Sequence, residues 1–187
     1  MLHLMRTKVA RRRLLALRTI RRLARRDDGA AAIEFGLVAA PFLLLLFAIM
    51  ETAIVFFAGQ TLETAVADSA RLIMTGQAQQ QGLNQTTFKQ AVCARIFGLF
   101  DCANGVYVDV KTYAAFANVN LTPPLDANGN FQNNMTYEPG AAGDIVVVRL
   151  FYKWPIYVSL LQNMSGNQRL MTATAAFRNE PFGPTTP

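Results

Sequence analysis

Apolar residues fill one stretch of this chain almost without interruption. Between residues 33 and 58 only Glu34 and Glu51 are charged. A helix of these 26 residues would be roughly 39 Å long, which exceeds the ~30 Å hydrocarbon layer of a bilayer. The pattern therefore predicts one membrane-spanning helix.

The helical pattern continues beyond this stretch in an amphipathic form. Apolar and small residues recur at helical spacing while charged residues take the other side. The recurring positions are Leu62, Ala65, Val66, Ser69, Leu72 and Ile73. Gly76 follows as a candidate C-cap. We expect one helix over residues 30–75, with Pro41 and Gly59 as candidate bends.

A second, short helix is expected after a polar link. Thr86 or Thr87 is a candidate N-cap. The apolar positions that follow at helical spacing are Phe88, Val92, Ile96 and Leu99.

Three later segments have the composition of strands. Residues 106–113 alternate in a way that is typical of a half-buried strand: Val106, Val108, Val110 and Thr112 lie on one side, and Tyr107, Asp109, Lys111 and Tyr113 on the other. Residues 145–154 are rich in β-branched and aromatic side chains, and residues 170–178 form a weaker candidate.

The segments between and after these strands are less regular. Residues 114–144 are rich in Asn, Pro and Gly, and a loop of this length is functional, mobile or conceals a further element. A short helix is expected near residues 156–162. The predicted fold class is α+β: a long N-terminal helix, then a small head of short helices and a sheet of three or four antiparallel strands.

The charge distribution separates the start of the chain from the rest. The formal net charge is +6, but ten of the 18 lysines and arginines precede Gly29, and the chain from Ala30 onward has a net charge of −2. This distribution argues against a nucleic-acid partner. The basic leader acts as a positive-inside topology signal or as an amphipathic helix on an anionic membrane. We expect a single-pass inner-membrane protein with a cytoplasmic N-terminus and a periplasmic or extracellular head.

The junction between leader and apolar helix is typical of type IV pilins. Glu34 is the fifth residue after Gly29, and Phe35 follows it. A secretory signal peptide fits less well, because its small-residue site follows the apolar run. Through residues 35–42, 50–52 and 67–79, the chain resembles the TadE family of pilin-like proteins of the tight-adherence (Tad/Flp) pilus.

The resemblance implies a processing event and a set of partners. A prepilin peptidase would cleave between Gly29 and Ala30. The other implied partners are pilin-like subunits, the Tad assembly machinery and membrane lipid. The presence of a whole further domain after the helix indicates a minor pilin or pseudopilin, since the major Flp pilin is much shorter. The implied organisation is a removed leader (residues 1–29), a membrane helix (30–59), its amphipathic continuation (60–76), a head (77–180) and a loose tail (181–187).

Two interpretations of Glu34 remain open. In type IV pilins the corresponding glutamate pairs with the N-terminal amine of a neighbouring subunit, and the resemblance gives this role to Glu34 alone. Alternatively, Glu34 and Glu51 are charges near the two membrane interfaces, since the 16 uncharged residues between them cover about 24 Å.

Cys93 and Cys102 are the only cysteines. They follow the membrane helix, on the side where thiols are oxidised. A disulfide between them would fix the second helix to the sheet and contribute ~2–3 kcal/mol. The alternatives are two buried free thiols or half of a metal site, although no histidine follows Gly29 to complete such a site.

Catalytic patterns are absent from the sequence. The single histidine, His3, lies in the leader, and no phosphate-binding glycine loop is present. Residues 126–130 resemble a calcium loop, but its glycine is misplaced and Tyr137 replaces the last acid, so a turn is expected. We predict a non-enzyme without cofactor or metal. It is either a pilin-like minor subunit or an uncleaved single-span anchor with an extracytoplasmic partner-binding domain.

Overall fold

The computed structural model describes residues 27–96, 98, 100–157 and 168–183. Most of the predicted leader, most of the helix expected near residues 156–162 and the end of the tail lie outside the described residues. The chain separates into two units, Met1–Ile49 and Met50–Pro187. The described part of the first unit is entirely helical.

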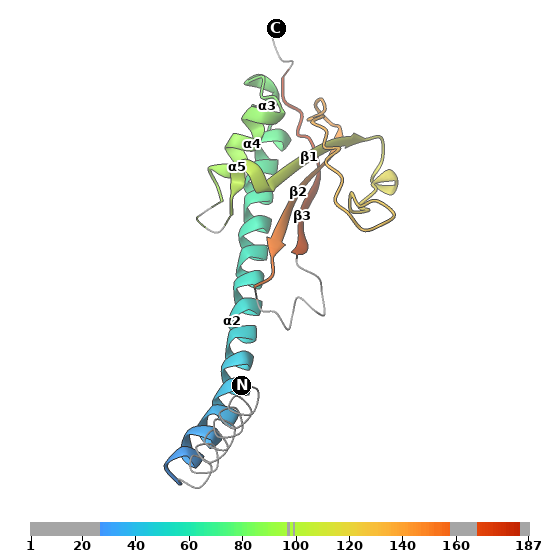
Figure 1. Ribbon diagram of the computed structural model, residues 1–187. Helices are drawn as coiled ribbons and strands as arrows, with labels where there is room; N and C mark the ends of the chain where they lie inside the picture. Colours follow the sequence, from blue (N-terminus) through green and yellow to red (C-terminus); the bar gives the residue numbers. More distant parts are fainter. Residues whose placement is uncertain (1–26, 97, 99, 158–167, 184–187) are drawn as a thin grey trace, which may run out of the picture. The chain divides into compact units, whose positions relative to one another are not determined.

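Helix α2 spans Asp27–Met74 and crosses the boundary between the two units (Figure 1). It stays helical through Pro41 and Gly59. Gly76 has a φ of 78°, and its N–H donates to the carbonyl of Ile73 at 3.0 Å. A side chain at this position would also collide with the ring of Phe182. The helix therefore ends as predicted, at a glycine in the left-handed conformation.

Four short helices follow in the described residues, and the start of the second one corrects a prediction. They are α3 (Gln77–Gln80), α4 (Gln85–Cys93), α5 (Cys102–Gly105) and the 3-10 helix η1 (Phe116–Asn118). The N-cap of α4 is Asn84, so the prediction of Thr86 or Thr87 was wrong. The Asn84 side chain accepts from the Thr87 N–H, and the Thr87 hydroxyl accepts from the Asn84 N–H, both at 2.9 Å. This reciprocal capping box satisfies two N–H groups, which explains why the helix starts earlier.

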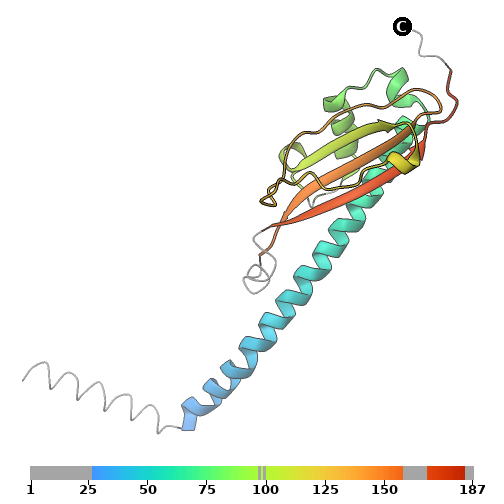
Figure 2. The same cartoon turned by 90° about the vertical axis from the view of Figure 1, so that its right-hand side faces the viewer.

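Within the part of the chain that the structure describes, the sheet has three strands, at the three segments that the sequence predicts. Strands β1 (Val106–Tyr113), β2 (Ile145–Pro155) and β3 (Gln168–Arg178) are antiparallel, in the order β1-β2-β3 (Figure 2). Within the register, Leu150 of β2 lies opposite Val108 of β1 and Ala173 of β3. Every residue from Ile145 to Tyr152 is buried, as expected for a central strand covered on both faces.

One face of the sheet packs against the helices and forms the core. The helical contributions come from the second unit of the chain, and the strands contribute alternate residues. The largest fully buried apolar side chains of this core are Phe88, Leu62, Ile73, Leu150, Val92, Val106, Val110, Val146 and Val148. The amphipathic part of α2 is therefore the part that covers the sheet.

The other face of the sheet is covered by residues 114–144. Phe131 packs against Tyr107 and Phe151, with ring centroids 4.6 and 5.9 Å apart. Residues 136–138 follow the outer edge of β1, where the Val110 N–H donates to Thr136 O at 2.9 Å. The predicted half-buried strand is therefore wrong at Asp109, whose residue exposure is 1%.

Candidate functional site: the apolar helix and its two glutamates

The N-terminal half of α2 exposes apolar side chains on all sides. Large apolar residues with 40% or more of their surface exposed occur throughout this half and shortly beyond it: Ile33, Phe35, Leu37, Val38, Phe42, Leu43, Leu44, Leu45, Leu46, Phe47, Ile49, Met50, Ile54, Phe56 and Phe57. A helix that is apolar all round needs lipid or other helices as its surroundings. Among the described residues, α2 is the one helix long and apolar enough to cross a membrane. The chain therefore has a single candidate membrane anchor followed by a C-terminal domain.

The predicted cleavage site lies within this helix. The Gly29–Ala30 bond is two residues into the described part of α2, and Ala30 is exposed. A peptidase that binds its substrate in an extended form must first unwind these residues. Glycine lowers the cost of unwinding, because it is about 1 kcal/mol less favourable than alanine in a helix.

Glu34 lies on the exposed surface of the helix, four residues after Ala30. Four helical residues advance by about 6 Å and turn by about 40°, so both residues lie on one side of the helix. Glu34 makes no hydrogen bond or ion pair with any residue that the structure describes. Its carboxylate is therefore accessible to a partner outside the chain.

Glu51 differs from Glu34 because it contacts the head. Its residue exposure is 8%, and its Oε1 accepts a hydrogen bond from the backbone N–H of Tyr157 at 2.6 Å. Tyr157 lies just after the end of β2, 106 positions away in sequence. No local pattern indicated this contact, since Glu51 was expected only to lie near a membrane interface.

The predicted disulfide is present between Cys93 and Cys102. Cys93 is the last residue of α4, Cys102 is the first residue of α5, and α5 leads directly into β1. Their Cα atoms are 5.6 Å apart. In addition, the Lys89 ammonium group donates to the carbonyl of Ala103 at 2.7 Å. The covalent bond and this hydrogen bond both hold α4 against the start of the sheet.

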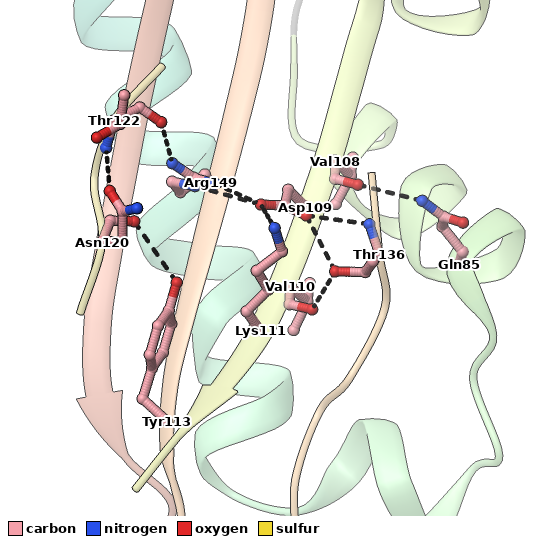
Figure 3. A network of polar contacts seen from close by, with 10 residues as sticks. All are labelled: Gln85, Val108, Asp109, Val110, Lys111, Tyr113, Asn120, Thr122, Thr136 and Arg149. Atoms are coloured by element: carbon pink, nitrogen blue, oxygen red, sulfur yellow. Dashed lines mark hydrogen bonds and ion pairs between the residues drawn. The ribbon is translucent and has the colours of Figure 1, made fainter. Parts of the chain in front are cut away.

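A buried ion pair in the head was not predicted (Figure 3). Arg149 of β2 lies opposite Asp109 of β1 and donates from Nη2 to its Oδ2 at 2.7 Å. Arg149 Nη1 also donates to the carbonyl of Thr122 at 3.0 Å. Asp109 Oδ1 accepts from the N–H of Thr136 at 3.0 Å and from its hydroxyl at 3.2 Å. The ion pair therefore holds two parts of the loop 114–144, at Thr122 and at Thr136, against the sheet.

The surroundings of Asp109 favour its charged form. Burial by itself raises the pKa of the carboxyl group. The Thr136 N–H, the Arg149 guanidinium and the nearby Lys111 ammonium together outweigh burial, so the pKa of Asp109 lies below its usual value. The sequence contained one sign of this pair. Arg149 is the single arginine in the apolar run of residues 145–152, and the neighbouring strand β1 contains one aspartate, Asp109.

The residues that resemble a calcium loop form a turn. The Asp126 carboxylate accepts from the N–H groups of Asn128 and Asn130 at 2.9 and 2.7 Å. These hydrogen bonds lower the pKa of Asp126. Within the described ranges, no group of three or more His, Cys, Asp or Glu residues is placed to hold a metal ion.

Comparison with known proteins gives one match. No curated protein and no solved structure matches the chain. The family model described as TadE-like protein matches residues 29–71, which begin at the predicted cleavage glycine and include both Glu34 and Glu51. This match confirms the resemblance found in the sequence: over residues 29–71 the chain is similar to the TadE-like family of the Tad pilus.

Proposed function

We propose that this protein is a minor pilin-like subunit that a prepilin peptidase processes and that takes part in the assembly of a Tad pilus for surface adherence. The match to the TadE-like family over residues 29–71 is the observation that carries the proposal. The family is structural rather than enzymatic. The position of the match also supports the proposal, because the first matched residue is Gly29, the glycine of the predicted cleavage site.

The proposed organisation follows from this role. Residues 1–29 are a cytoplasmic leader that is removed, and residues 30–59 hold the subunit in the inner membrane until assembly. Residues 60–76 continue the helix into a periplasmic head of residues 77–180, which ends in a short tail of residues 181–187. Apart from Glu51, the buried positions of the helix begin at Ala58, close to the end of the proposed membrane segment, which fits this division.

Glu34 has the assembly role in this proposal. After cleavage, the new amino group of Ala30 is positive, and an unpaired charge near the hydrocarbon layer is unfavourable. Glu34 of one subunit pairs with the Ala30 amine of its neighbour and so favours docking in one register. The exposed, unpaired carboxyl group of Glu34 supports this role, whereas Glu51 already has a partner in its own head.

Substitution of the glycine tests the processing step. Gly29→Val should leave the protein at full length in the membrane, because a β-branched side chain obstructs the extended backbone in the peptidase. Gly36→Val is the matched control: it places the same side chain in the same helix, where nothing lies within 4 Å of an added Cβ. The control should still lose its leader, as measured by intact mass. A Gly29→Val protein that still begins at Ala30 would show that the site is misassigned.

The second candidate function is an uncleaved anchor whose head binds a partner. The contact between Glu51 and Tyr157 favours it to a limited extent, because it shows the head tied to the helix that would anchor it. Full-length protein in cells with an active prepilin peptidase would select this alternative.

A further inference from the structure

We infer that the end of the head next to Tyr157 rests on the bilayer, with the Tyr157 side chain in the lipid headgroup interface. This inference rests on the membrane anchoring in the proposed function and goes beyond it, since it makes the head itself a lipid-binding surface. The residues that form the contact, Glu51 and Tyr157, both belong to one unit, Met50–Pro187.

The first step is the exposed apolar surface beyond Glu51. Phe56 and Phe57 are 71% and 64% exposed, and Ile54 is also exposed. These residues lie in the same helix as the apolar span and continue its surface without a break in sequence. Two exposed phenylalanines on a helix surface indicate an apolar surrounding rather than water.

The second step is the length of the span. The 16 uncharged residues between Glu34 and Glu51 cover about 24 Å, which is shorter than the ~30 Å hydrocarbon layer. With Glu34 at the cytoplasmic interface, about 20 residues are needed, so the hydrocarbon layer extends to about Ile54. Glu51 therefore lies at or below the outer boundary of the hydrocarbon layer.

The third step is the environment of Glu51. A carboxyl group at this depth is unfavourable unless it is sheltered and hydrogen-bonded. The structure supplies both conditions: Glu51 is 8% exposed and accepts from the Tyr157 N–H at 2.6 Å. The head itself buries Glu51, so this part of the head must lie at the outer boundary of the hydrocarbon layer.

The fourth step is the position of Tyr157 along the helix axis. Phe56 and Phe57 lie five and six residues after Glu51, which is about 8–9 Å further from the N-terminal end of the helix. The backbone of Tyr157 is fixed at the level of the Glu51 carboxyl group. Tyr157 is thus nearer to the centre of the bilayer than either phenylalanine, and it is 74% exposed. An exposed tyrosine at this depth suits the headgroup interface, where its ring contacts acyl chains and its hydroxyl contacts water.

Lipid quenching of a fluorophore tests the contact. Tyr157→Cys in the full-length protein is labelled with an NBD fluorophore, which is straightforward because Cys93 and Cys102 are joined and do not react. The protein is placed in phosphatidylcholine and phosphatidylglycerol vesicles that carry no quencher, a doxyl quencher near the headgroup or a doxyl quencher near the end of the acyl chain. Leu45→Cys is the control within the span, and Thr174→Cys is the exposed control on β3.

With the headgroup quencher, the expected result is a severalfold larger loss of fluorescence at position 157 than at position 174, whereas position 45 should be quenched most by the acyl-chain quencher. Quenching at 45 with no more quenching at 157 than at 174 would overturn the inference while leaving the anchor intact. Absence of quenching at all three positions would overturn the membrane anchor together with the inference.

Discussion

Removal of the Arg149 guanidinium should destabilise the head strongly. Arg149 donates to Asp109 Oδ2 from Nη2 at 2.7 Å and from Nε at 3.3 Å, and the side chains of the two residues are 7% and 2% exposed. Arg149→Met keeps most of the side-chain volume but leaves the Asp109 carboxylate buried without its main partner. Breaking one side of a buried ion pair costs about 3–5 kcal/mol. We expect the free energy of unfolding to fall by this amount.

Two further variants separate the buried charge from other effects. Lys111→Met removes an ammonium group 3.7 Å from the same oxygen, but the Lys111 side chain is 34% exposed, so the loss should be at most about 1 kcal/mol. Asp109→Asn combined with Arg149→Met removes both charges and keeps an acceptor for Thr136. This double variant should be more stable than Arg149→Met alone, because no unpaired charge remains in the interior.

The assay is urea unfolding of the full-length protein in detergent, followed by the fluorescence of Trp154. This residue is the only tryptophan and is 6% exposed in the core of the head. Because the pKa of Asp109 is lowered in the folded state, its stabilising effect is present above the unfolded pKa and is lost as the pH falls through the folded pKa. Arg149→Met should weaken this acid dependence. A loss below about 1 kcal/mol, or an unchanged pH profile, would refute the assigned role of the pair.

Two other predictions concern the disulfide and Glu34. Replacing Cys93 and Cys102 by serine should lower the free energy of unfolding by about 2–3 kcal/mol, as measured by the same urea titration; an unchanged midpoint would mean that the crosslink does not constrain the head. Glu34→Ala should still be cleaved but should abolish piliation and surface attachment, whereas Glu51→Gln should be milder, since an amide oxygen can still accept from the Tyr157 N–H. Normal piliation with Glu34→Ala would leave Glu34 as only an interfacial charge.

The sequence predicted the elements of the fold because each has a local pattern. The long helix was expected over residues 30–75 and is Asp27–Met74. The strands were expected over residues 106–113, 145–154 and 170–178, and all three are present with ends that differ by at most two residues. The apolar periodicity within each segment is sufficient for such predictions.

Contacts between distant segments could not be predicted in the same way. Asp109 was placed on the exposed side of a half-buried strand, because nothing local shows that residues 114–144 cover that face. The link between Glu51 and Tyr157 depends on where β2 ends relative to the helix, which is a property of the packed head. The N-cap at Asn84 was missed for a smaller reason: Thr87 acts as the third residue of the capping box rather than as the cap.

The central claim, that the protein is a processed pilin-like subunit, is tested most directly by its intact mass and N-terminal sequence. The native protein would be isolated from the membrane of cells that have the prepilin peptidase and of cells that lack it. We predict a chain that begins at Ala30 in the first case and at the start of the leader in the second. A chain that retains its leader through Gly29 in the presence of an active peptidase would contradict the claim.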